Sequence, residues 1–282
     1  MEDHVRHQVV GGNGTRIAVR TSGPIGAPTF VLVHGWAQSS AVWSAQFADP
    51  ALTSKYRLAA FDLRGHGDSE LAEDYSDSAA WAGDVAAVLD LVGKPAILVG
   101  WSLGGAVVMD YLRRHGDREL AGIVLVGAAT EMGKARPGAR MGAVLRAAMP
   151  ASLAEDPEIA SPALAEFVRG MSASPLPEPT VRRMVLDSLR VPWQVRRAVL
   201  RRDFDSSDVL ASIKVPTLVV HGQLDAVLDP EVGEYSHGKI SGSEKRWLLG
   251  VGHLPFAERT EEFDEMLLEF AERVLVSQEV GE

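Results

Sequence analysis

The sequence predicts an α/β fold built on a mostly parallel sheet. Short apolar runs rich in β-branched residues alternate with amphipathic helical patterns, and this alternation is typical of βαβ units. Apolar runs without polar alternation suit strands buried on both faces between layers of helices. The runs that we expect to form such strands are Thr29–His34, Arg57–Phe61, Ala96–Gly100, Ile123–Val126, Thr217–His221 and Lys245–Leu249.

Two further strands are expected near the N-terminus. Arg6–Val10 and Arg16–Thr21 flank the sequence Gly11-Gly12-Asn13-Gly14. Glycine and asparagine favour the tight turns that close β-hairpins. These two strands therefore add an antiparallel edge to the sheet.

Helical patterns separate the strands. Ser78–Leu91 carries apolar residues at spacings of three and four, and Ser78 is a suitable N-cap. Gly104–Arg114 and Glu231–His237 predict two further helices, and Glu258–Val276 predicts a final helix with an acidic first turn. The apolar stripe of the final helix consists of Phe263, Met266, Leu267, Phe270 and Val274.

Between Glu131 and Asp208 the alternation stops. This stretch has no convincing strand, is interrupted by prolines and holds five of the eight methionines. A structureless loop of this length is rare in a compact domain, so we expect an inserted helical subdomain at residues 131–208. The core domain then comprises residues 1–130 and 209–282. The apolar faces of the insertion form either a second core or a lid over a site.

The composition excludes several classes of function. Lys+Arg 28 against Asp+Glu 38 gives a net charge of −10, so we expect no nucleic-acid partner and no membrane surface as partner. The absence of cysteine excludes disulfides, thiolate catalysis and Cys-ligated metals. Met1–His7 holds no apolar stretch, and no run approaches the roughly 18 apolar residues of a membrane helix. We therefore expect a cytoplasmic protein.

The sequence Gly100–Gly105 joins an expected strand directly to an expected helix. It contains the pattern Gly-x-Ser-x-Gly, which in this context forms a sharp turn that exposes the serine. Gly100 and Gly104 leave room for that turn. Ser102 lies at a helix N-terminus, where the helix dipole favours a developing oxyanion. We therefore predict Ser102 as a nucleophile.

A serine nucleophile needs a general base and an acid that orients the base. His253 lies in a glycine-rich turn after the last expected strand, at the carboxyl edge where open α/β sheets bind ligands. Asp225 follows another strand at the same edge, with Asp229 as the competing acid. His221 ends that strand and is expected to help hold the acid loop. The predicted catalytic residues are Ser102, Asp225 and His253.

An oxyanion formed on the substrate needs two backbone N–H donors. We expect one from Leu103, the residue after the nucleophile, and one from Trp36, in the loop after the strand that ends at His34. The Trp36 ring either walls an acyl pocket or belongs to the core. We expect no metal site. The residues expected to line the substrate pocket are Trp36, Trp101, Met132, Met141, Met171 and Leu254.

Together these motifs resemble the α/β-hydrolase superfamily. The resemblance rests on His34-Gly35-Trp36, Phe61–Ser69, Gly100–Gly105, Asp225 and Gly-x-Gly-His253, in this order. It covers essentially the whole chain and implies an α/β-hydrolase fold with an eight-stranded sheet flanked by helices and an inserted helical cap. It also implies Ser-His-Asp acyl transfer without a cofactor, and it makes His66 and Asp68 part of a structural turn.

The resemblance extends to the pimeloyl-ester carboxylesterase branch and to small-molecule esterases and lactonases. Dehalogenases and epoxide hydrolases of the superfamily carry aspartate in place of Ser102 and are disfavoured. We therefore expect a serine hydrolase that cleaves a small to medium, largely apolar ester or lactone through an acyl-enzyme. The alternatives are a C–C bond hydrolase of a ring-cleavage diketone, a cofactor-free perhydrolase and a non-catalytic small-molecule receptor.

Arginine pairs recur in the inserted stretch. They form either a solvated helix face or a contact with an anionic group of the substrate. The pairs are Arg182-Arg183, Arg196-Arg197 and Arg201-Arg202.

Overall fold

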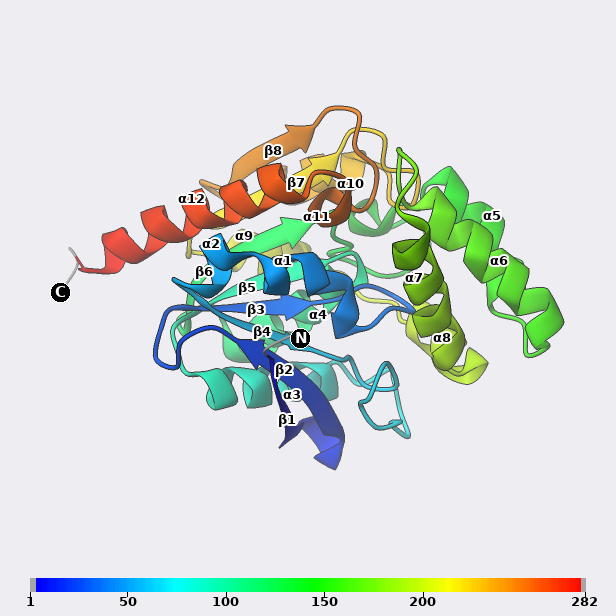
Figure 1. Cartoon of the computed structure of the whole chain (residues 1–282), viewed down its shortest axis with the longest axis horizontal. Coiled ribbons are helices and arrows are strands. Elements are labelled where there is room, and N and C mark those ends of the chain that lie inside the picture. Colours follow the sequence, from blue (N-terminus) through cyan, green and yellow to red (C-terminus); the bar gives the residue numbers. More distant parts are fainter. Residues whose placement is uncertain (1–3, 280–282) are drawn as a thin grey trace.

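The computed structural model describes residues 4–279 and contains an eight-stranded sheet in the order β1-β2-β4-β3-β5-β6-β7-β8 (Figure 1). β1 pairs with β2, and β2 with β4, in antiparallel fashion, whereas the other neighbours are parallel. The predicted fold class is therefore confirmed. The strands are β1 (Val5–Val10), β2 (Arg16–Ser22), β3 (Thr29–Val33), β4 (Arg57–Phe61), β5 (Ala96–Trp101), β6 (Leu120–Val126), β7 (Thr217–Gly222) and β8 (Glu244–Leu248).

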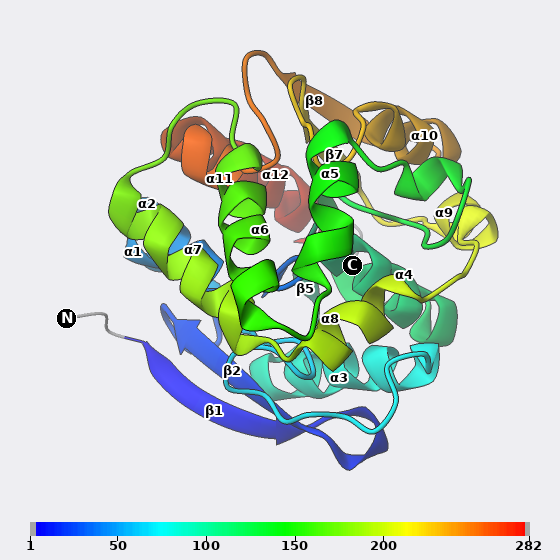
Figure 2. The same cartoon turned by 90° about the vertical axis from the view of Figure 1, so that its right-hand side faces the viewer.

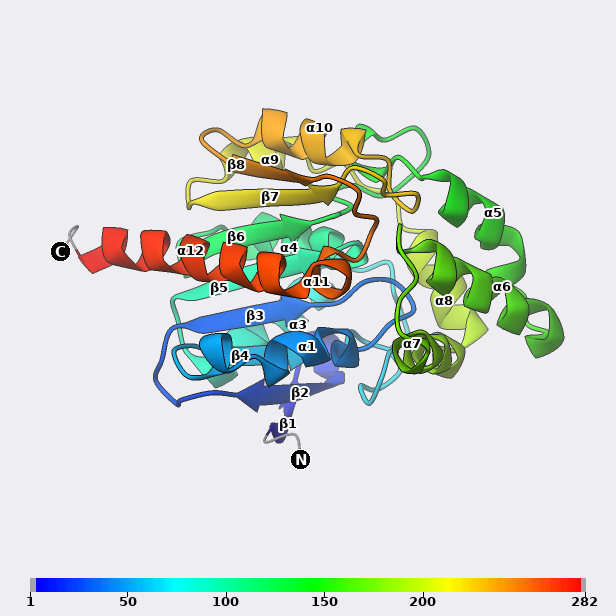
Figure 3. The ribbon, with the colours of Figure 1, turned by 45° about the horizontal axis from the view of Figure 1, so that its top comes forward.

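Helices cover both faces of this sheet. α1, α2 and α12 lie on one face, and α3 and α4 lie on the other (Figure 3). The α-helices of the described residues are α1 (Ser44–Ala48), α2 (Pro50–Thr53), α3 (Ser78–Val92), α4 (Leu103–His115), α5 (Ala143–Ser152), α6 (Pro157–Gly170), α7 (Glu178–Arg190), α8 (Trp193–Leu200), α9 (Ser207–Ser212), α10 (Glu231–Lys239), α11 (Pro255–Glu258) and α12 (Thr260–Glu279). No helix in this part of the chain is both long and apolar enough to cross a membrane. The sequence expectation for the N-terminus falls partly on residues 1–3, which lie outside the described residues.

Several helix boundaries differ from the sequence prediction. Asp77, not Ser78, caps α3, because its carboxylate accepts the N–H of Ala79 at 2.9 Å. The predicted final helix is divided, since the backbone of Arg259 leaves the helical region between α11 and α12. α1 and α2 were not predicted, because helices this short are too brief to display a helical period.

The apolar stripe predicted for the final helix is buried. Its five members are at most 8% exposed, and α12 packs beside β6. Trp43 extends this cluster, with its ring centroid 4.5 Å from that of Phe256 and 6.5 Å from that of Phe263. Packing of this kind fixes the last helix against the sheet, and with it the loop that precedes α11.

The segment between β6 and β7 contains helices α5 to α9. α5 to α8 lie beyond the carboxyl ends of the parallel strands, on the side to which the arrows of those strands point (Figures 1 and 2). Met132 and Phe204 form an isolated antiparallel bridge where the segment leaves and re-enters the sheet domain. The boundaries at residues 131 and 208 stay a prediction, and α9 already begins at Ser207.

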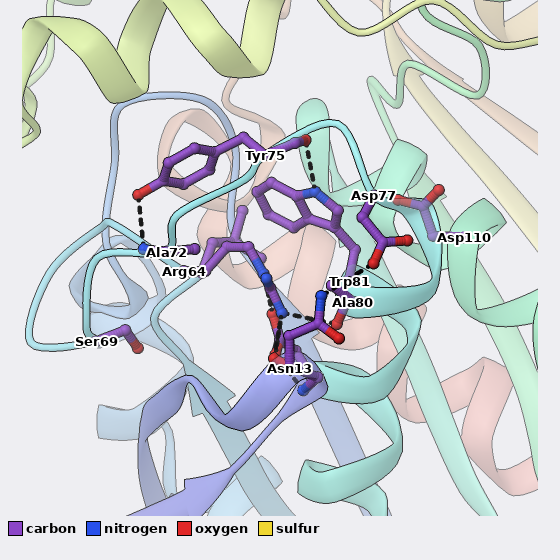
Figure 4. A network of polar contacts seen from close by, with 12 residues as sticks. Asn13, Arg64, Ser69, Ala72, Tyr75, Asp77, Ala80, Trp81 and Asp110 are labelled. Carbon is purple, nitrogen blue, oxygen red and sulfur yellow. Dashed lines mark hydrogen bonds and ion pairs between the residues drawn. The ribbon is translucent and has the colours of Figure 1, made fainter.

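Arg64, in the turn after β4, joins three parts of the core. Its guanidinium contacts both carboxylate oxygens of Asp84 on α3, at 2.7 and 2.8 Å, and donates to the carbonyls of Gly12 and Ala80 (Figure 4). The same group lies 5.5 Å from the centre of the Trp81 ring. The N-terminal hairpin, the turn after β4 and α3 are therefore held by one buried ion pair.

Removal of Asp84 leaves the Arg64 charge buried without its partner. Breaking a buried ion pair in this way costs about 3–5 kcal/mol, so we expect Asp84→Ala to lower the free energy of unfolding by that amount in urea titrations. The control is Lys55→Ala, which removes the exposed pair with Glu272 and is expected to cost less than about 1 kcal/mol. Equal losses in the two variants would contradict this view of Arg64.

Burial raises the pKa of Asp264, on α12, to about 7. Gln46 donates to this carboxylate at 2.8 Å and opposes the shift, whereas the nearby Asp49 adds to it. Because the folded state holds the proton more tightly than the unfolded state, stability is lost as the pH rises from about 4 to about 7.

Asp264→Asn removes this penalty and is expected to raise the melting temperature at pH 8 by several degrees, since each kcal/mol of relieved penalty is worth about 2–4 °C in a domain of 150–250 residues. The gain shrinks toward pH 5, where wild-type Asp264 is protonated. Glu269→Gln, at an exposed position of the same helix, is the control and should change little at either pH. A gain that is independent of pH would refute the explanation.

Candidate active site

Ser102 lies at the turn from β5 into α4, with φ 55° and ψ −120°. This left-handed backbone is held by close packing of two glycines. A Cβ on Gly100 would lie 2.8 Å from the carbonyl oxygen of Gly104, and one on Gly104 would lie 2.4 Å from the carbonyl oxygen of Val33. The carbonyl of Ser102 accepts N–H groups of Gly105 and Ala129 at 3.0 Å. The strand–turn–helix geometry expected from the sequence is therefore present.

Asp225 and His253 are hydrogen-bonded, with 2.7 Å between His253 Nδ1 and Asp225 Oδ2. His221 Nε2 lies 3.0 Å from the same oxygen, and the N–H groups of Val227 and Leu228 donate to Oδ1 at 2.8 and 3.0 Å. Burial by itself would raise the pKa of Asp225, but the two histidines outweigh it and hold that pKa well below its usual range. The carboxylate is therefore charged and fixed, and His221 holds it as expected.

The competing acid, Asp229, lies elsewhere. Its Oδ1 accepts the N–H of Glu231 at 3.0 Å, and its Oδ2 lies 3.6 Å from Arg140. Of the two aspartates in the loop after β7, the structure brings only Asp225 to the histidine.

The backbone of His253 is held from two sides. Its N–H donates to the carbonyl of Met171, just after α6, at 2.7 Å, and its carbonyl accepts the indole N–H of Trp101 at 2.9 Å. A Cβ on Gly252 would lie 2.6 Å from the backbone nitrogen of Ala173. The loop that carries His253 is therefore packed directly against the segment between β6 and β7.

The loop after β3 lies against Ser102. A Cβ on Gly35 would be 2.9 Å from the Cβ of Ser102. Burial lowers the pKa of His34 to about 4, so its neutral ring donates from Nδ1 to the Gly35 carbonyl at 2.8 Å and accepts the Leu63 N–H at Nε2 at 2.9 Å. Among the described residues, the N–H groups of Trp36 and Leu103 have no hydrogen-bond acceptor.

Ser102, His253, Trp36 and Leu103 line one cavity of about 310 Å³. Ser102 Oγ makes no hydrogen bond with any described residue. The Trp36 ring does more than fill the core, because it lines this cavity while its Nε1 donates to the Arg196 carbonyl at 3.1 Å. The other apolar residues that line the cavity include Trp101, Met132, Met141, Leu145, Met149, Phe167, Met171, Leu200, Val227 and Leu228.

A family model described as the alpha/beta hydrolase family matches residues 30–266. The chain belongs to this family. It is similar to the esterase RhEst1 from Rhodococcus sp. ECU1013, with 38% identity, a TM-score of 0.88 and coverage of 96% of this chain and 98% of that one. A putative aryl esterase from Burkholderia cenocepacia is 28% identical, with a TM-score of 0.88 and coverage of 96% and 100%. A pimeloyl-[acyl-carrier protein] methyl ester esterase from Methylococcus capsulatus is 30% identical, covering 89% of this chain and 97% of the relative.

Two expectations about side chains of this α/β hydrolase are corrected. Leu254 does not line the cavity, because it is fully buried where the chain enters α11. Arg196 and Arg202 do not belong to a solvated helix face. Arg196 is buried and donates to the carbonyls of Ser188 and Val191, whereas Arg202 forms a buried ion pair described below.

The cavity walls include Met149 and Phe167, which sequence reasoning did not select. Met149 belongs to the methionine-rich stretch that was noted, whereas Phe167 gave no signal beyond one apolar position in a helix. His66 and Asp68 lie outside the cavity, as expected for a structural turn: His66 lies 3.0 Å from the Arg64 carbonyl, and Asp68 pairs with Arg190 at 2.7 Å.

Gly104→Ala tests whether the turn at Ser102 needs its glycine. The added Cβ meets the carbonyl oxygens of Val33 and His34 at 2.4 and 3.0 Å, so we expect a clear fall in melting temperature despite the better helix propensity of alanine. Gly238→Ala, in α10, is the matched control, because its Cβ would meet nothing within 4 Å. Thermal unfolding of both variants is measured, and a Gly104→Ala protein as stable as the control would contradict the packing argument.

Proposed function

We propose that the chain is a serine esterase that cleaves a carboxylic ester or lactone through an acyl-enzyme. The observation that carries this proposal is the His253–Asp225 hydrogen bond beside the cavity that Ser102 also lines. A nucleophile, a base and an acid that orients the base are the groups that acyl transfer requires. The relatives described as esterases support the same class of reaction.

In this mechanism Ser102 Oγ attacks the acyl carbon while His253 Nε2 takes its proton. Asp225 accepts the hydrogen bond of His253 Nδ1–H and stabilises the imidazolium that forms. The N–H groups of Trp36 and Leu103 stabilise the oxyanion of the tetrahedral intermediate. His253 then gives the proton to the leaving alcohol, and later activates the water that releases the acid and restores Ser102.

The cavity supports a small to medium, largely apolar substrate. A volume of about 310 Å³ is at the lower end of the range for ligand pockets, which runs from about 300 to 1,000 Å³. Met132, Met141, Met149 and Met171 line it, and flexible thioether side chains adapt to acyl groups of different shape.

Residues 131–208 act as a cap over this site in the same proposal. The cap contributes cavity walls, and its α7 is tied to the loop after β3. Gln38 Nε2 donates to Ser188 Oγ at 2.8 Å, and Ser39 Oγ donates to Asp187 at 2.8 Å. These contacts support a cap that is fixed to the core domain through α7.

Three substitutions test the roles directly. Ser102→Ala and His253→Ala are expected to lower kcat by about 10⁴-fold or more, and Asp225→Asn by about 10⁴-fold, because the members of a triad act as a unit. The controls change the same residue types outside the cavity and are Ser212→Ala, His237→Ala and Asp229→Asn. Their kcat should stay within about twofold of the wild-type value, which corresponds to less than about 1 kcal/mol. Loss of activity in Asp229→Asn with retention in Asp225→Asn would overturn the assignment of the acid.

The substrate class is tested with purified protein and no added metal. The panel contains p-nitrophenyl esters of rising acyl length, several lactones and one ring-cleavage diketone, and it includes hydrogen peroxide as an alternative acceptor. Turnover of esters or lactones that depends on Ser102 supports the proposal. Turnover of the diketone alone would favour C–C bond hydrolysis, oxidation that depends on peroxide would favour a perhydrolase, and binding without turnover would favour a receptor.

A further inference from the structure

Part of the cavity lining is charged and has no role in the proposed ester cleavage. The residues are Lys134, Arg201, Arg202 and Asp203. The antiparallel bridge between Met132 and Phe204 brings them together, because the chain that leaves Met132 runs beside the chain that enters Phe204.

The charge of Arg202 is already neutralised. Its guanidinium contacts both carboxylate oxygens of Asp110, on α4, at 2.6 and 2.8 Å, and both side chains are buried. The Arg202 guanidinium also lies over the Trp81 ring, 5.1 Å from its centre. Arg202 therefore has a structural role at the edge of the cavity.

Asp203 is also paired, with Arg136 at 3.0 Å. In contrast, Lys134 and Arg201 are exposed, and no ion pair or hydrogen bond joins either side chain to another residue whose side chain the structure describes. We call these two residues the cationic rim. In a chain with a net charge of −10, the rim places two uncompensated positive charges on the lining of the cavity that Ser102 shares.

We propose that the cationic rim binds a carboxylate carried by the ester substrate. This inference rests on the proposed function, because it names the substrate class of the same cavity. A guanidinium and an ammonium group both donate charge-assisted hydrogen bonds to a carboxylate. The methionine-lined walls accommodate the methylene groups between that carboxylate and the ester at Ser102. Monoesters of straight-chain dicarboxylic acids have this combination of groups.

The first experiment compares matched pairs of methyl esters that differ in a terminal carboxylate. The pairs are monomethyl adipate with methyl hexanoate, monomethyl suberate with methyl octanoate, and monomethyl sebacate with methyl decanoate. The rate of proton release gives kcat/KM for each ester. The quantity compared is kcat/KM for the charged ester divided by kcat/KM for the neutral ester of the same pair. The variants are wild type, the double variant Lys134→Gln/Arg201→Gln and the control Arg182→Gln, which removes an exposed charge of α7 outside the cavity.

For the pair whose chain length spans the distance from Ser102 to the cationic rim, we expect this ratio to fall about 5- to 10-fold in the double variant. A loss of this size is expected when two partly screened ion pairs with the substrate are removed. Raising the salt concentration from 0.1 to 1 M should reduce the wild-type ratio toward the same value, because the screening length shortens from about 10 to about 3 Å. Arg182→Gln should leave the ratio unchanged. A ratio that is the same in the double variant and in wild type for all three pairs would overturn the inference.

The second experiment measures binding without turnover. Monomethyl suberate is titrated by calorimetry into Ser102→Ala and into the same variant with Lys134→Gln and Arg201→Gln. We expect about 5- to 10-fold weaker binding without the rim, and equal affinities would count against the inference. If the wild-type protein hydrolyses no ester but Ser102→Ala binds monomethyl suberate through the rim, the proposed function is wrong and the inference about the cationic rim is supported. If esters are hydrolysed but the ratio of kcat/KM values is the same in all variants, the inference about the cationic rim is wrong and the proposed function is supported.

Discussion

The site depends on the backbone of Ser102, which is held in the left-handed region at φ 55°. A non-glycine residue in a sparsely populated conformation costs of order 1–3 kcal/mol, so the surrounding structure must impose it. Here the imposing contacts are backbone packing, with Gly104 against Val33 and Gly100 against Gly104. This packing places the Ser102 side chain at the N-terminus of α4 and beside the carboxyl end of β3. The loop that contains Trp36 begins at the same end of β3. The same backbone packing therefore positions the proposed nucleophile and the proposed oxyanion donors.

The proposed base depends on a second contact, between the core and the segment from β6 to β7. The N–H of His253 donates to Met171, while its ring donates to Asp225. The residues that shape the cavity thus also hold the histidine. A change in the proposed cap that moves Met171 is therefore expected to alter the proposed catalysis as well as the choice of substrate.

Sequence reasoning predicted the geometry where it is local or follows from strand order. The turn at Ser102 is encoded in six consecutive residues, and the closeness of Asp225 and His253 could be predicted because parallel strands end at one edge of a sheet. It failed where the outcome depends on tertiary packing. Leu254 follows His253 in sequence yet turns into the core, and no periodicity could have shown that. Likewise, the Arg201-Arg202 pair divides into one exposed and one buried side chain, because only Arg202 meets Asp110.

The most direct test of the central claim is covalent labelling of the native protein with diisopropyl fluorophosphate. Attack by Ser102 Oγ forms a serine–phosphorus bond and expels fluoride, while His253 takes the hydroxyl proton. Mass spectrometry should find one adduct per chain, on the peptide that contains Ser102, and much slower labelling of Asp225→Asn. An adduct on another residue, or ester hydrolysis that continues after complete labelling of Ser102, would contradict the account.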